Sequence, residues 1–154
     1  MSRALVLACG NRLRGDDGVA SYIAKCLREQ RSGPETEIRV DQQWAPELAE
    51  PISAAEIVIF IDASANLRPG KIACRAVQPA PHSPATFTHQ ASPATLLSLA
   101  NELYGRAPAQ AYLVTIGGSS FDLVEVLSEP VRQAVPEAVK QINALMSGSH
   151  PPAP

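Results

Sequence analysis

Short apolar runs alternate along the chain with segments whose apolar residues have helical spacing. The apolar runs predict five strands, at residues 5–9, 37–40, 57–61, 71–77 and 111–116. The helical spacing predicts helices at 19–31, 46–50 and 93–103, and a last helical region that begins near Ser128. This order predicts one three-layer α/β/α domain over residues 1–146, with a twisted, mostly parallel, five-stranded sheet. Residues 147–154 are predicted to be a disordered tail.

The most strongly apolar run, at 57–61, is typical of a central strand that is covered on both faces. No helix fits between it and the run at 71–77, so we expect these two strands to form an antiparallel pair with the second at a sheet edge. Two prolines bear on the helices. Pro51 is expected to break or kink the helix that Pro46 opens, and Pro136 to begin the main segment of the last helix.

Composition and charge narrow the classes of function. A net charge of −2, with scattered Lys and Arg, provides no basic surface for nucleic acid. No apolar run is long enough to span a membrane, and the first residues do not resemble a signal peptide, so we expect a cytoplasmic protein without a membrane partner. We also expect a monomer. The three cysteines are widely spaced, which predicts reduced thiols and not a disulfide framework.

Two adjacent carboxylates, Asp16 and Asp17, lie in the glycine-rich loop between the first strand and the first helix. Such a loop lies beyond the carboxyl end of a strand, where α/β sheets hold ligands. Acids at this position disfavour phosphate and suit a cation or a general base. Either residue could cap the helix, but one cap requires only one Asp, which leaves the second for another role.

A second acid and a histidine follow in other connections. Asp62 comes directly after the central apolar run, where it could lie at the same sheet edge as Asp17 or cap a turn. His89 ends a proline-rich loop just before the helix at 93. Because the three connections can converge at one edge of the sheet, Asp17, Asp62 and His89 form a candidate ligand set for a borderline divalent metal, with positions open for water or substrate.

The sequence allows two interpretations each for the stretch 117–120 and for Trp44. The stretch 117–120 has free backbone N–H groups that could hold a peptide or an anion, whereas its serines lack the surroundings of a nucleophile. Trp44 could line a site or pack over the helix that follows it.

Several motifs, taken in order, resemble the HycI/HybD-type family of [NiFe]-hydrogenase maturation endopeptidases. They are Gly10-Asn11-x-Leu13-x-Gly15-Asp16-Asp17-Gly18, an apolar strand that ends in Asp62-Ala63, the turn Pro69-Gly70, and Thr88-His89 ahead of a Leu-rich helix. The resemblance runs from about Ala4 to Met146. It implies that Asp17, Asp62 and His89 bind metal, that Asp16 is the helix cap, and that Asp17 and Asp62 are the catalytic pair.

The resemblance also implies an activity. Such enzymes are aspartyl processing endopeptidases that remove a C-terminal extension from the hydrogenase large-subunit precursor after nickel insertion. Nickel, supplied by the substrate, is the recognition signal, and other divalent metals could bind in vitro. The stretches 41–46 and 117–120 depart from the family pattern, which bears on the choice of partner. The alternative is a non-catalytic accessory module that binds the nickel-loaded precursor or another metalloprotein. A flavodoxin-like nucleotide binder is disfavoured by the acids of the first loop.

Overall fold

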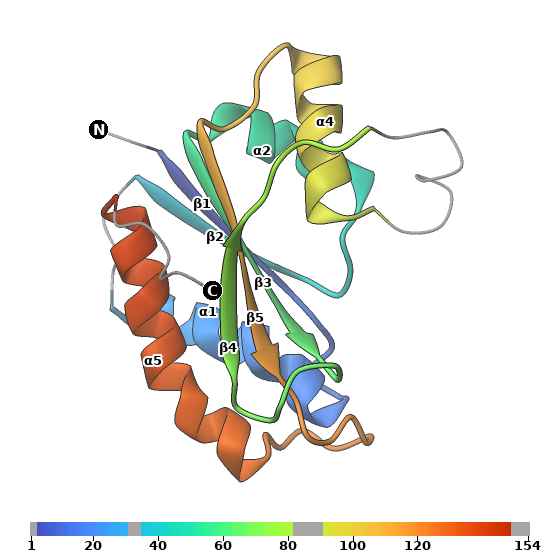
Figure 1. Cartoon of the computed structure of the whole chain (residues 1–154), viewed down its shortest axis with the longest axis vertical. Helices are drawn as coiled ribbons and strands as arrows, with labels where there is room; N and C mark the ends of the chain where they lie inside the picture. The colour runs from blue at the N-terminus through green and yellow to red at the C-terminus, as the bar shows by residue number, and fades with distance from the viewer. Residues whose placement is uncertain (1–2, 31–34, 82–90, 149–154) are drawn as a thin grey trace.

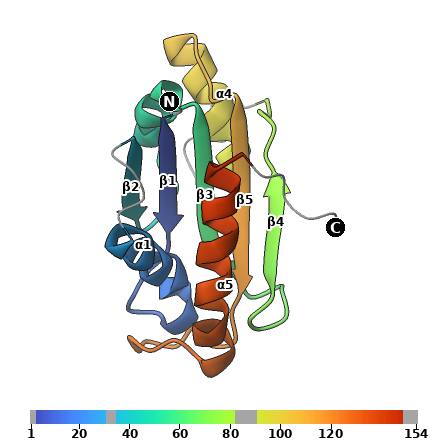
Figure 2. The same cartoon turned by 90° about the vertical axis from the view of Figure 1, so that its left-hand side faces the viewer.

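Five strands form one sheet in the computed structural model, which describes residues 3–30, 35–81 and 91–148. Figure 1 shows the sheet nearly edge-on, and Figure 2 shows the order of its strands, which is β2-β1-β3-β5-β4. Four strands run parallel and β4 runs antiparallel at an edge. The predicted fold class is therefore confirmed. The strands are β1 (Ala4–Cys9), β2 (Thr36–Asp41), β3 (Ile57–Ser64), β4 (Ile72–Ala76) and β5 (Gln110–Gly117).

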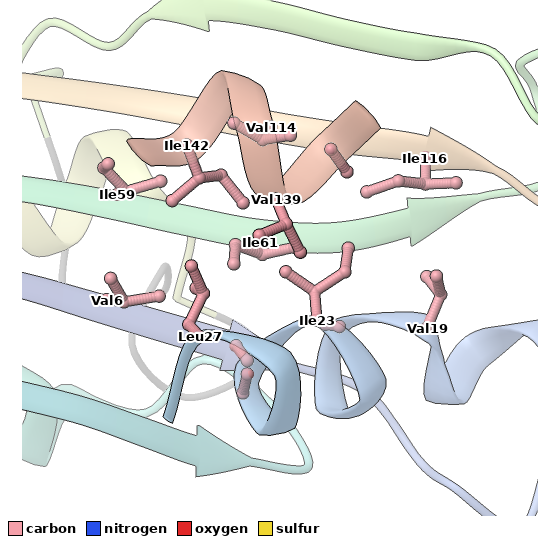
Figure 3. Packing of buried hydrophobic residues seen from close by; sticks show 14 of the residues in the cluster. Val6, Val19, Ile23, Leu27, Ile59, Ile61, Val114, Ile116, Val139 and Ile142 are labelled. Atoms are coloured by element: carbon pink, nitrogen blue, oxygen red, sulfur yellow. The ribbon is translucent and has the colours of Figure 1, made fainter. Parts of the chain in front are cut away.

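Helices cover both faces of the sheet (Figure 2). Helices α1 (Val19–Glu29) and α5 (Glu129–Met146) pack on one face, and α2 (Ala49–Ala54) and α4 (Pro93–Tyr104) pack on the other. Because side chains alternate along a strand, β3 sends Ile59 and Ile61 to the first core, shown in Figure 3, and Phe60 to the second. Both faces of β3 are therefore buried, as its continuous apolar run predicted.

The neighbour predicted for β4 is wrong. β4 lies at the edge and runs opposite to β3, but it pairs with β5, which lies between the two. β5 pairs with β3 over eight residues, from Ile57↔Gln110 to Ser64↔Gly117, and so occupies the place beside the central strand. β4 has only five residues, and it pairs with the other side of β5 at the edge of the sheet.

Both proline predictions for the helices need correction. Pro51 is the third residue of α2, in the first turn, where a backbone N–H has no partner within the helix, so it does not break α2. Pro136 lies inside α5, which begins at Glu129 and runs for 18 residues. Although Pro136 removes one helical hydrogen bond, the helix continues because it buries an apolar stripe that includes Val131, Val139 and Ile142.

The predicted boundaries of α4 are confirmed. Ser92 and Thr95 form a capping box at its start, and Gly105 ends it in the left-handed conformation with φ 69°. Trp44 packs edge-on against Phe60, with ring centroids 5.4 Å apart, which supports the packing interpretation of that residue. Within the described part of the chain, no helix is long and apolar enough to cross a membrane. Residues 149–154 of the predicted tail lie outside the described residues.

Candidate active site

A row of polar side chains crosses the sheet at the carboxyl ends of its parallel strands. Cys9 of β1 pairs with Asp41 of β2, and Asp62 of β3 pairs with Thr115 of β5. Paired residues point to the same face, and alternation from Phe60 places Asp62 on the α2 and α4 side. The strand register therefore aligns these four side chains in one row near the carboxyl ends of the strands.

Asp62 lies within β3 and not after it, because the strand continues to Ser64. Its Oδ1 atom accepts a hydrogen bond of 2.8 Å from the Thr115 hydroxyl on the neighbouring strand. The turn-capping alternative for Asp62 is therefore wrong. That role belongs to Ser64, whose hydroxyl oxygen accepts a hydrogen bond from the Asn66 N–H.

Asp17 lies in the 3₁₀ turn Gly15–Gly18 that leads into α1. The backbone N–H of Asn11 donates a 2.7 Å hydrogen bond to Asp17 Oδ2. Asn11, at the beginning of the first loop, therefore holds the carboxylate of Asp17, at the end of the same loop. Gly10 permits this folding back, because a Cβ atom there would lie 2.0 Å from the Asp17 carbonyl oxygen. The first loop thus closes tightly around Asp17.

The charges of these acids act on one another and on Cys9. Burial is the main cause that raises the pKa of Asp62; the Thr115 hydroxyl and Arg75 oppose it, and the negative charge of Asp17 adds to it. Burial, with the charges of Asp62, Asp17 and Asp41, raises the pKa of the Cys9 thiol to about 12. The site therefore contains a carboxyl group disposed to hold a proton and a thiol that stays neutral at pH 7.

The predicted role of Asp16 as the cap of the first helix is wrong. The 3₁₀ turn and α1 both begin without a side-chain cap hydrogen bond. Instead the Asp16 side chain is fully buried and accepts four hydrogen bonds: from the N–H groups of Ser119 (2.7 Å), Ser120 (3.0 Å) and Ser128 (2.7 Å), and from the Ser128 hydroxyl (2.7 Å). Burial acts to raise the pKa of Asp16, but these hydrogen bonds together lower it.

The contacts of Asp16 also show what the backbone N–H groups of the stretch 117–120 bind. Its N–H groups at Ser119 and Ser120, predicted to be free for a peptide or an anion, are occupied by the Asp16 carboxylate. The anion that this stretch holds is therefore a side chain of the same molecule.

The predicted metal ligands are only partly placed. Asp17 and Asp62 lie at the same edge of the sheet, while His89 lies outside the described residues, so the three-ligand set stays a prediction. Among residues 3–30, 35–81 and 91–148, no three His, Cys, Asp or Glu side chains are arranged to hold a metal ion. Two carboxylates can contact a divalent cation, but they need further ligands from elsewhere to hold it.

Sequence analysis missed Asp41 and Thr115 as neighbours of the acids and took Cys9 only for a reduced thiol. The signal that could have found them is that each is polar or weakly polar near the carboxyl end of a parallel strand. Only the strand register, which aligns these ends, turns that signal into a common site.

Neither a protein-family model nor a curated protein sequence matches the chain. Solved structures do. A hydrogenase maturating endopeptidase, HybD from E. coli, is 28% identical with a TM-score of 0.73, over 95% of this chain and 94% of that chain. An endopeptidase from Escherichia coli is 27% identical with a TM-score of 0.71, over 96% and 95%.

A third structure extends the likeness in fold. The [NiFe] hydrogenase maturation protease HycI from Thermococcus kodakarensis has a TM-score of 0.72 at 21% identity, over 96% of this chain and 94% of that chain. These likenesses cover nearly the whole chain. They confirm the resemblance drawn from the sequence: the chain is similar in sequence and in fold to a hydrogenase maturating endopeptidase.

Proposed function

We propose that this chain removes a C-terminal extension from the large-subunit precursor of a [NiFe]-hydrogenase once nickel has been inserted. The observation that carries the proposal is the pairing of Asp17 and Asp62 at the carboxyl edge of the sheet, close enough that the charge of one raises the pKa of the other. The names of the similar structures support protease activity. The nickel requirement rests on the family resemblance.

The acids suggest how a peptide bond would be cut. A water molecule forms the new C–O bond as the peptide C–N bond breaks, a carboxylate takes the proton of the water, and the same group returns it to the leaving nitrogen. Asp62 suits this exchange because its raised pKa lies nearer to neutrality. Asp17, held by the Asn11 N–H, would orient the substrate. Nickel already bound in the precursor would supply Lewis acidity and the signal that the precursor is ready.

Cleavage can be tested by incubating the purified protein with nickel-loaded and nickel-free precursor and measuring the precursor mass. We expect loss of a C-terminal peptide from the loaded form alone, and about 100-fold slower loss with Asp17→Asn, because misplacing a substrate has effects of this order. An unchanged mass with the loaded precursor, despite stable binding, would instead favour the non-catalytic accessory module.

A cysteine mechanism is tested by Cys9→Ser. Because the pKa of the Cys9 thiol is raised to about 12, the thiolate is scarce at pH 7, and we expect the variant to retain cleavage within about threefold. The measurement is the initial rate of cleavage at pH 7. A loss comparable to that of Asp17→Asn would make Cys9 a nucleophile and overturn the assignment of the chemistry to the acids.

A further inference from the structure

Apolar side chains are exposed in a cluster beside the candidate active site. Among the described residues, eight large apolar side chains are exposed, and six of them lie on or near the first loop, the end of β2 and the segment between β5 and α5. The most exposed are Leu123 (83%) and Val126 (68%). The others of the six are Leu13, Tyr22, Val40 and Val124. We call these six residues the apolar rim. Contiguous exposed apolar side chains mark interaction sites more often than scattered ones do.

Two adjoining hollows lie along the apolar rim. The first, of about 290 Å³, is lined by residues 10–13 of the first loop, 40–42 at the end of β2, and Glu125. The second, of about 370 Å³, lies between α1 and α5 and is lined by Tyr22, Val126 and Pro136 among others. Glu125 lines both, so the two hollows adjoin at this residue, and we call them together the path. Since one water occupies about 30 Å³ of liquid, each hollow has room for a side chain.

The segment that carries Leu123 and Val126 is held firmly, although its apolar side chains face outward. It crosses from the end of β5 to the first loop and returns to α5 (Figure 2). The Gly15 N–H donates to the Val124 carbonyl oxygen (2.7 Å) and the Asp16 N–H donates to the Ser120 carbonyl oxygen (2.8 Å). The buried Asp16 carboxylate then fastens both ends of the segment, at Ser119 and Ser128. A surface ordered in advance loses less entropy when it binds a partner.

The path begins at the catalytic acids. Asn11, whose N–H holds Asp17, lines the first hollow, and so does Asp41 of the polar row. A polypeptide with its scissile bond between Asp17 and Asp62 must therefore lie next to the first hollow. Resting on the function proposed above, we propose that the apolar rim, held in place by Asp16, is the surface that contacts the substrate protein, with apolar side chains of that protein in the two hollows.

The proposal is tested with Leu123→Asp and a matched control, Leu103→Asp. Leu103 is also exposed (61%) but lies on α4, away from the rim. With nickel-loaded precursor, Leu123→Asp should raise KM at least tenfold and leave kcat within twofold, because the acids are untouched, and Leu103→Asp should change neither. A KM unchanged in Leu123→Asp, or raised equally in both variants, would overturn the proposal.

The anchoring role of Asp16 is tested at its partner Ser128. Ser128→Ala removes the hydroxyl that donates to Asp16 and should raise KM severalfold, whereas Ser128→Thr keeps a hydroxyl and should restore it. A merely structural defect would lower stability without this split between KM and kcat, so the melting temperature of each variant is measured too. Equal KM for wild type, alanine and threonine variants would remove Asp16 from the proposal.

Measuring the affinity for the precursor tests the apolar rim independently of cleavage. Each surface variant is also made with Asp62→Asn, and its affinity for loaded precursor is measured directly. If wild type does not cleave but the Leu123→Asp change still weakens binding tenfold, the function fails and the surface stands. If sedimentation shows that wild type is a dimer and Leu123→Asp a monomer, the occupant of the rim is a second copy and the substrate surface is overturned.

Discussion

Replacing Asp62 with asparagine should abolish precursor cleavage and at the same time stabilise the folded protein at neutral pH. The first effect, at least about 100-fold in rate, follows from loss of the group that we propose to exchange the proton. The second follows because the folded state holds an ionised carboxylate where burial and Asp17 both oppose the charge. Asparagine keeps an oxygen that can accept the Thr115 hydrogen bond without carrying that charge.

The pH dependence of this stabilisation has a definite sign. Since the pKa of Asp62 is raised on folding, the unfolded chain releases its proton first as pH rises, and stability falls above the ordinary value of 3.8 until the folded pKa is passed. Asp62→Asn lacks this loss. Its melting temperature should therefore exceed that of wild type at pH 7, and the difference should shrink as the pH approaches 3.8 from above.

Asp41→Asn is the matched control, because Asp41 lies in the same polar row on β2 but is not one of the two acids proposed to be catalytic. It should retain kcat within a few-fold. Equal losses in the two variants would mean that the row acts only through its total charge. An Asp62→Asn protein that melts below wild type at pH 7 would contradict the assignment of a destabilising charge to Asp62.

Much of the fold was predictable because it follows from local patterns. The continuous apolar run of β3 indicates burial on both faces, and Ser92, Pro93 and Gly105 mark the ends of α4. The neighbour of β4 was not predictable in the same way. Which strand lies beside another depends on competing pairings between distant segments, and no local pattern shows that β5 enters between β3 and β4.

The candidate site likewise has one part that local patterns predict and one part that depends on distant partners. Asp17 and Asp62 could be placed at one edge because parallel strands bring their carboxyl ends together. Asp16 could not be interpreted correctly, because its donors at Ser119 and Ser128 are 103 and 112 residues away in sequence. A capping role is what a local rule favours for an Asp before a helix, and only the tertiary structure shows the distant partners.

Gly10→Ala should cause the second large effect, because it affects both the backbone and the place of Asp17. Gly10 has φ +154°, which side chains rarely adopt, and an added Cβ would lie 2.0 Å from the Asp17 carbonyl oxygen. The loop must open to relieve this contact, at a cost of about 1–3 kcal/mol for overpacking in addition to backbone strain. We expect cleavage to fall at least about tenfold, because displacements near 1 Å at catalytic groups have effects of this order or larger.

Gly105→Ala separates the two causes. Gly105 also has a positive φ, +69°, but nothing lies within 4 Å of a Cβ there, so its replacement should cost only the backbone strain, about 1–2 kcal/mol, and leave cleavage unchanged. Because the two φ values differ, the backbone strain does not cancel in urea unfolding, and the comparison of cleavage between the two variants is what reports the contact of Gly10 with Asp17. If both lose the same stability and both still cleave, the tight closure of the first loop is not what places Asp17. If Gly10→Ala loses activity beyond its loss of stability, the lack of a side chain at Gly10 is what allows the Asp17 carboxylate to keep its place.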